Sequence, residues 1–118
     1  MGWVYLIGEA DIPNHFKIGS TRAENIEKRI KQLQTGNSSP LYLHDSFQTS
    51  QPFKLEKMLH NRFKSCNMIN EWFDLNKEDV RDFKAVCEEY QSIINALNDN
   101  PFFNKRTIYN KNRKCLKR

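Results

Sequence analysis

The sequence predicts one α+β domain, mixed α/β in its element order, in which helices flank a small three-stranded antiparallel sheet. The chain has 118 residues, which is enough for one hydrophobic core and one domain. Short apolar or alternating segments lie near the N-terminus, and later segments repeat apolar residues at helical spacing. Aromatic residues make up 12% of the chain, which favours a compact core over disorder.

The first two elements are short strands that would pair as an antiparallel hairpin. Residues 3–8 (WVYLIG) are typical of a buried strand. Aspartate, proline and asparagine within residues 11–14 supply turn chemistry. Residues 15–19 (HFKIG) follow as the second strand, in which Lys17 faces away from its apolar neighbours.

A helix and a third strand come next. Thr21 and Glu24 form a capping-box pattern that predicts where the helix begins. A stripe at helical spacing would be buried, while three basic residues lie off it: the stripe is Ile26, Ile30 and Leu33, and the basic residues are Lys28, Arg29 and Lys31. Gly36, Asn37 and Pro40 end the helix, and residues 41–44 with Phe47 form the third strand.

The C-terminal half adds two helices and a short extended piece. The first of these helices runs from Phe53 to about Phe63, and residues 71–75 are extended. Asn76 caps the last helix. Its buried stripe is Val80, Phe83, Cys87, Tyr90, Ile94 and Leu97. We expect a core over 1–76, a helix packed on it over 77–100, and a flexible basic tail over 101–118.

Charge is concentrated at the C-terminus. The net charge is +5, and the last fifteen residues hold seven basic side chains and no acidic one, so the remainder is close to neutral. The seven are Lys105, Arg106, Lys111, Arg113, Lys114, Lys117 and Arg118. A neutral body with a cationic tail favours a polyanionic partner, namely nucleic acid, over a terminus that only aids solubility.

Other classes of protein are disfavoured by composition. No apolar run approaches the ~20 residues that a membrane span needs, so we expect no membrane partner. The apolar start lacks the basic region and cleavage site of a signal peptide. The three cysteines form no CxxC pair and are odd in number, which indicates reduced thiols in a reducing, cytoplasmic compartment.

Four polar residues have side chains suited to phosphodiester hydrolysis: Tyr5, Lys17, Arg29 and Glu56. A phenol can position or deprotonate water, and cations neutralise phosphate charge. A carboxylate holds a hard divalent ion through oxygen. Each residue also has an ordinary interpretation, because a strand tyrosine is commonly a core aromatic and the other three are common on surfaces.

Four motifs, which follow one another along the chain, favour the catalytic interpretation of these residues. They are VYLI with FKIGST about ten residues later, then KRIKQLQTGN, LEKMLHNRF and NEWFDL. Together, over about residues 3–76, they resemble the GIY-YIG nuclease family, in the phage and bacterial branch called T5orf172-like or MUG113-like. The resemblance implies a metal-dependent endonuclease that cuts DNA, in the cytoplasm of a bacterium or of a phage-infected host.

The resemblance also implies roles by position. Tyr5 matches the tyrosine of the first motif, Arg29 the helix arginine, and Glu56 the glutamate that binds one Mg²⁺ or Mn²⁺. Lys17 stands where many members have a second tyrosine. Its ammonium would favour the Tyr5 phenolate, and Tyr5 would orient or deprotonate the attacking water. A late asparagine of the family corresponds to Asn70, and Asn67 is nearly as good a match.

Some supporting residues and rival functions stay open. Lys28, Lys31 and the seven basic residues of the tail are candidate DNA contacts. His60 lies one turn after Glu56, and no third ligand at a suitable spacing supports a zinc site, so His60 is a candidate supporting residue. One site per chain would nick DNA, and cutting both strands would need two protomers or two visits. The main rival is a non-catalytic DNA-binding or regulatory module, and a protein-interaction factor is a third class.

Overall fold

A computed structural model describes residues 1–99 of the chain. The helices and strands follow one another as β1 (Gly2–Glu9), β2 (Ile12–Thr21), α1 (Ile26–Thr35), β3 (Leu41–Thr49), α2 (Pro52–Arg62), a 3₁₀ turn (Lys64–Cys66), β4 (Asn67–Ile69), β5 (Trp72–Asp74), α3 (Lys77–Arg81) and α4 (Phe83–Asp99). The sheet has the order β3-β1-β2-β5-β4, and every neighbouring pair is antiparallel. The predicted α+β class is therefore confirmed.

The sheet has five strands, so the prediction of three is wrong. The expected extended piece at residues 71–75 is β5, which pairs with β2, and β4 adds the fifth strand. Residues 70 and 71 form the turn between β4 and β5, and Asn70 has a left-handed φ of 52°. Asparagine tolerates this conformation better than most residues, which explains its place in the turn.

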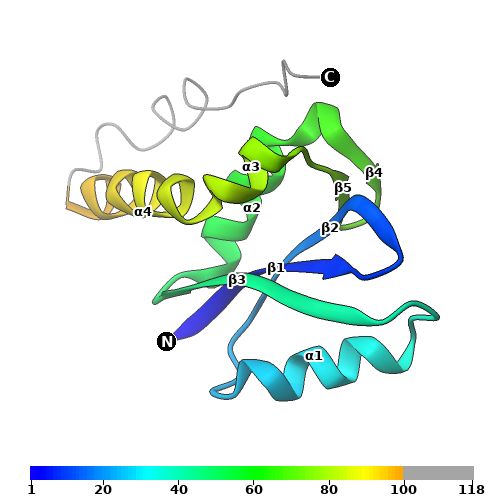
Figure 1. Cartoon of the computed structure of the whole chain (residues 1–118). Helices are drawn as coiled ribbons and strands as arrows, with labels where there is room; N and C mark the ends of the chain where they lie inside the picture. Colours follow the sequence, from blue (N-terminus) through cyan, green and yellow to red (C-terminus); the bar gives the residue numbers. More distant parts are fainter. Residues whose placement is uncertain (100–118) are drawn as a thin grey trace.

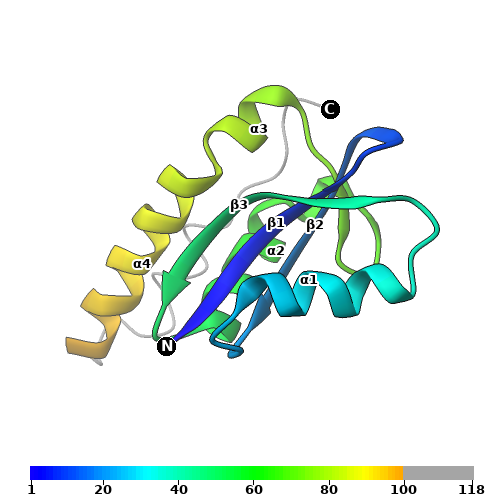
Figure 2. The same cartoon turned by 60° about the horizontal axis from the view of Figure 1, so that its bottom comes forward.

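Helices cover both faces of the sheet (Figures 1 and 2). α1 lies on one face, and α2 and α4 lie on the other. Side chains alternate between these faces along each strand. In β1, Val4 and Leu6 contact the cluster beneath α2 and α4, whereas Tyr5 is buried outside that cluster. Tyr5 therefore faces α1, which decides the side of the sheet on which its hydroxyl can act.

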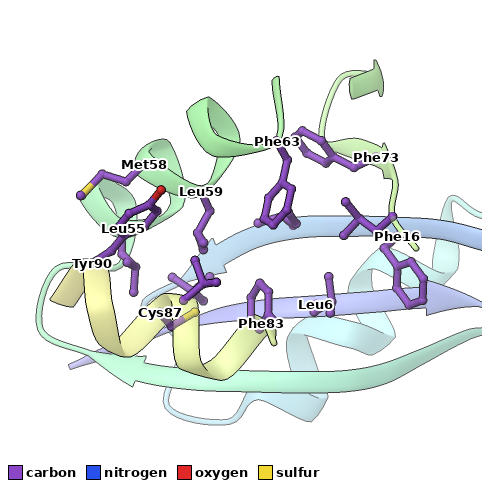
Figure 3. Close-up of a cluster of buried hydrophobic side chains, with 14 of the residues drawn as sticks. Leu6, Phe16, Leu55, Met58, Leu59, Phe63, Phe73, Phe83, Cys87 and Tyr90 are labelled. Carbon is purple, nitrogen blue, oxygen red and sulfur yellow. The ribbon is translucent and has the colours of Figure 1, made fainter. Parts of the chain in front are cut away.

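The main hydrophobic core fills the space between the sheet, α2 and α4 (Figure 3). Leu6 and Phe16 contribute from the strands, Leu55 and Leu59 from α2, and Phe83 from α4. The predicted stripe of the last helix is buried at every position: Val80, Phe83, Cys87, Tyr90, Ile94 and Leu97. Burial of such large apolar side chains contributes about 1.5–3 kcal/mol each before chain entropy is subtracted.

The helix starts were predicted with mixed success. α1 begins at Ile26, and its N-cap is Asn25, whose side chain accepts hydrogen bonds from two backbone amides of the first turn. The capping box predicted at Thr21 and Glu24 is therefore wrong, because Thr21 still belongs to β2. Asn76 caps as predicted, in a capping box with Asp79.

Two further expectations about the helices need correction. The predicted last helix is two helices, because α3 ends at Arg81 and α4 begins at Phe83. The stripe of α1 is only half-buried, and this helix holds no fully buried residue. α1 covers the sheet without a deep core of its own, which leaves room for polar groups between helix and strands.

Two of the three cysteines, Cys66 and Cys87, lie within the described residues. Cys87 is a buried free thiol, as expected, whereas Cys66 is disulfide-bonded, which contradicts the expectation of a reduced thiol at that position. Within residues 1–99, no helix has the length and apolar character needed to cross a membrane. The basic tail that we predicted lies outside the described residues.

Candidate active site at the open edge of strand β2

The candidate site forms where β2 loses its outer neighbour. β5 pairs with β2 only over residues 15–17, and the Ile18 amide donates the last backbone bond to Glu71 O at 3.1 Å. Beyond that point, Gly19 and Ser20 lie at an edge with no strand on this side among residues 1–99. Figure 1 shows this part of β2 between α1 and α2. Side chains from both faces of the sheet can therefore meet around it.

Tyr5 reaches this edge from the α1 face because residue 19 has no side chain. Tyr5 pairs with Gly19 across β1 and β2. A Cβ on Gly19 would lie 2.6 Å from the hydroxyl oxygen of Tyr5 and 2.7 Å from its ring. Real Cβ atoms essentially never approach so closely, so glycine is what lets the Tyr5 phenol lie across β2.

Arg29 comes from α1 to the same place. Within residues 1–99, Tyr5 Oη and Arg29 Nε are the two buried side-chain polar atoms without a hydrogen-bond partner. We had placed Arg29 off the buried stripe of its helix, yet the structure turns its guanidinium inward. Unpaired buried polar atoms cost about 1–3 kcal/mol each, and such atoms commonly mark a functional site.

The surroundings of Tyr5 keep its hydroxyl protonated. Burial raises the pKa of Tyr5, and the nearby guanidinium of Arg29 opposes that effect. The negative charges of Glu71 and Glu56 raise the same pKa further. Lys17, which we expected to favour the phenolate, is not among these influences. Tyr5 is therefore a neutral phenol at neutral pH, suited to donating a hydrogen bond.

Glu56 reaches the edge from α2, on the opposite face. Its Oε1 accepts a hydrogen bond from the Ser20 hydroxyl, and its Oε2 lies 3.4 Å from His60 Nε2. The carboxylate is largely buried, with 17% of its side chain exposed. Burial raises its pKa, the Ser20 bond lowers it, Glu71 raises it and His60 lowers it. Ionised Glu56 is thus held in a place where a cation would stabilise it.

His60, on α2, bonds to the backbone of β2 at this edge. Its Nε2 lies 2.8 Å from the carbonyl oxygen of Ile18. A carbonyl oxygen only accepts, so Nε2 carries the hydrogen and donates it. This bond satisfies the free edge of β2 and orients the ring beside Glu56. Since Nε2 is engaged in this way, the structure favours a supporting role for His60 over a zinc pair with Glu56.

Lys17 lies next to the site rather than against Tyr5. Its Nζ is 3.3 Å from a carboxylate oxygen of Glu71 and 5.5 Å from the centre of the Trp72 ring. Trp72 also stacks on His15 at 4.4 Å and lies outside the main core. Phe73, the next residue, is buried in the core.

The two candidate asparagines shape the β4–β5 hairpin. Asn70 occupies its turn, and the Asn67 side chain donates to the carbonyl oxygens of Asn70 at 2.9 Å and Trp72 at 3.2 Å. A pocket of about 430 Å³ opens between this hairpin and α2, where Lys57 is among its lining residues. Both asparagines are therefore accounted for by the turn that carries Glu71.

The structure brings Tyr5, Arg29 and Glu56 around one strand edge and leaves other predicted residues apart. Lys28 and Lys31 are exposed on α1. The tail residues predicted to bind DNA lie outside the described part of the chain: Lys105, Arg106, Lys111, Arg113, Lys114, Lys117 and Arg118. Sequence reasoning missed Ser20 as a partner of Glu56. Glu71 belongs to the NEWFDL motif, but the sequence alone indicated no role for its carboxylate.

The donor set fits a hard divalent cation. Within residues 1–99, no three histidine, cysteine or acidic side chains form a ready-made metal cluster. Mg²⁺ commonly takes only one or two carboxylates from the protein and keeps several waters or substrate phosphates. The Glu56 carboxylate beside the unpartnered Tyr5 hydroxyl suits such a half-hydrated ion and does not suit a closed zinc site.

Comparison with known proteins identifies the family and no individual relative. Neither a curated protein nor a solved structure matches the chain significantly. A family model does match, that of the T5orf172 domain, over residues 2–88. This range covers the whole sheet, α1, α2 and the start of α4, and so extends past residue 76, where the resemblance in the sequence ended. With most of its length matched, the chain belongs to the T5orf172 domain family.

Proposed function

We propose that this protein is a metal-dependent DNA endonuclease that hydrolyses phosphodiester bonds at the edge of β2. The observation that carries the proposal is the meeting of Tyr5, Arg29 and Glu56 around Gly19 and Ser20. Membership of the T5orf172 family supports a nuclease-like or DNA-binding role. The GIY-YIG resemblance of the motifs supports the finer assignment.

Each side chain has a task that its surroundings permit. The Arg29 guanidinium would bind the scissile phosphate and its transition-state charge, and its Nε has no other partner within residues 1–99. The Tyr5 hydroxyl, kept neutral by burial, would donate a hydrogen bond to the phosphate or orient the attacking water. Ser20 and His60 would hold Glu56 in one orientation.

A divalent cation such as Mg²⁺ or Mn²⁺, held through Glu56, would supply charge stabilisation at the leaving oxygen. Bound water would complete its coordination together with phosphate oxygens. The protein would offer one such site per chain, so a single chain would nick one strand. Cutting both strands would require two chains on DNA or two successive binding events.

Plasmid nicking by purified full-length protein tests the proposal. Supercoiled plasmid should be nicked with Mg²⁺ or Mn²⁺ and left intact with EDTA. Glu56→Gln should abolish nicking and bind DNA within a few-fold of the wild type, because an amide is a poor ligand for a hard cation. Removing a negative charge also cannot weaken attraction to phosphate.

Glu88→Gln is the matched control, since it makes the same change on α4, away from the edge of β2. It should nick like the wild type. DNA binding without nicking under every metal condition would favour the rival function, a non-catalytic DNA-binding or regulatory module. Nicking retained by Glu56→Gln would place the metal site elsewhere.

A further inference from the structure

The β4–β5 hairpin brings a second carboxylate to the edge of β2. Glu71 is the second residue of the two-residue turn, and its backbone oxygen accepts from the Ile18 amide at 3.1 Å. The left-handed Asn70 and the Asn67 side chain bonds fix this turn. Glu71 is therefore anchored by its backbone at the place where β2 becomes free.

The negative charge of the Glu71 side chain influences both Glu56 and Tyr5. It raises the pKa of both groups. Both residues contact β2: Glu56 accepts from the Ser20 hydroxyl, the backbone oxygen of Glu71 accepts from the Ile18 amide, and the Glu71 carboxylate lies 3.3 Å from Lys17 Nζ. The two carboxylates thus come from α2 and from the hairpin turn to one short segment of strand.

A pair of acidic side chains alone is not a site, and the Tyr5 hydroxyl supplies the independent observation. Tyr5 is fully buried and lies across Gly19 toward this edge, and its Oη makes no hydrogen bond within residues 1–99, although Arg29 lies close to it. The hydroxyl can bind a metal-bound water or phosphate oxygen that would satisfy it. An unpaired donor beside two repelling carboxylates fits a hydrated cation.

We propose that Glu71 would supply a second carboxylate ligand for the divalent cation, in addition to Glu56, and that Lys17 is the counter-ion that Glu71 holds when the cation is absent. Lys17 Nζ is 3.3 Å from Glu71 Oε1, and the Glu71 side chain is 40% exposed, so solvent and ions can reach it. The assignment rests on the proposed function, because it takes for granted that a cation binds at Glu56. Lys17 and the cation would then compete for one carboxylate.

Manganese binding without DNA tests this proposal directly. The free Mn²⁺ signal in electron paramagnetic resonance gives the dissociation constant for the full-length protein. Glu71→Gln should weaken Mn²⁺ binding by at least about tenfold, the loss seen when even a supporting partner of a ligand is removed. Lys17→Met should strengthen it, because the competing ammonium is gone. Glu88→Gln, the same charge change on α4, should leave it unchanged.

The outcomes separate this inference from the proposed function. If Glu71→Gln binds Mn²⁺ like the wild type while Glu56→Gln loses it, Glu71 is no ligand and the single-carboxylate site stands. If Lys17→Met binds Mn²⁺ more weakly than the wild type, the competition is refuted. If the wild type binds no Mn²⁺ at millimolar concentration, both proposals fail. Circular dichroism of each variant shows whether it is folded, and Glu71→Asp keeps the charge and should recover part of the affinity.

Discussion

The hydroxyl oxygen of Tyr5 lies where the side chain of residue 19 would be, 2.6 Å from the Cβ that any residue other than glycine would carry there. Tyr5 and Gly19 pair across β1 and β2, so this close approach is built into the register of the sheet. It is how a phenol buried beneath α1 reaches the open edge of β2.

Gly19→Ala should damage both stability and cleavage. The new methyl group would overlap the Tyr5 ring, and overpacking of this kind costs about 1–3 kcal/mol of the free energy of unfolding. Displacing the phenol by about 1 Å should slow nicking by up to about 100-fold. Thermal unfolding and single-turnover nicking measure the two effects.

Gly36→Ala is the matched control for that change. A Cβ on Gly36, at the end of α1, meets nothing within 4 Å, and its φ of −98° suits any residue. This variant should keep wild-type stability and nicking. Equal behaviour of the two alanine variants would contradict the role given to the Tyr5–Gly19 contact.

Tyr5→Phe should separate function from stability. It removes a buried hydroxyl that has no partner among residues 1–99, so the free energy of unfolding should stay constant or rise by about 1 kcal/mol. Nicking should fall at every pH. Tyr90→Phe is the contrast, because its hydroxyl accepts from Arg62 at 3.4 Å, and its loss should cost about 0.5–1.5 kcal/mol. A large loss of stability in Tyr5→Phe would show that its hydroxyl is already satisfied.

Lys17→Met should leave the midpoint of the pH–rate profile for cleavage unchanged. Burial raises the pKa of Tyr5, and the cation that opposes this effect is Arg29. Lys17 instead pairs with Glu71. Single-turnover rates from pH 6 to 9 should therefore give parallel profiles for the variant and the wild type. An upward shift of the midpoint by about one unit or more would restore the coupled Tyr5–Lys17 base suggested by the sequence.

Glu56→Gln should stabilise the fold at neutral pH. Because burial raises the pKa of Glu56 in the fold, its ionised form costs stability there. That cost is absent at pH values below the ordinary carboxyl pKa of 4.5 and develops as pH rises through the higher pKa of the folded state. The melting temperature of the variant should match the wild type at low pH and exceed it at pH 7. A gain of 1 kcal/mol would correspond to about 4–8 °C. A higher melting temperature of the wild type at pH 7 would show instead that the ionised carboxylate of Glu56 stabilises the fold.

Neutralising the tail should weaken DNA binding without changing the chemistry. Replacing all seven basic residues from Lys105 to Arg118 by glutamine removes their charge and keeps the length of the chain. Counterion release gives a slope of log K against log salt of about −0.9 per phosphate contacted, so the slope should change by about two to five. Nicking at saturating DNA should be unaltered. An unchanged slope would mean that the tail serves another partner.

The sequence determined the elements whose signals are local. Alternating and apolar runs predicted β1 and β2, and apolar residues at helical spacing predicted α2 and α4. The position of Asn76 predicted the N-cap of the helix that follows it. The sequence also pointed to Tyr5, Arg29 and Glu56, because ordered motifs resemble those of a family. Glu71 was visible in the EWF motif, but nothing local to it indicated what its carboxylate would meet.

The tertiary structure decided everything that depends on long-range pairing. β4 is three exposed residues without apolar alternation, so its pairing with β5 rather than its composition makes it a strand. The antiparallel register sets Tyr5 against Gly19, and the early end of β5 leaves an edge where groups from both faces of the sheet meet. Arg29 turns inward because α1 is only half-buried and leaves space against the sheet. The sequence specifies the residue types, but the distances between side chains far apart along the chain, such as Tyr5 and Gly19, are set only when the strands pair and the helices pack.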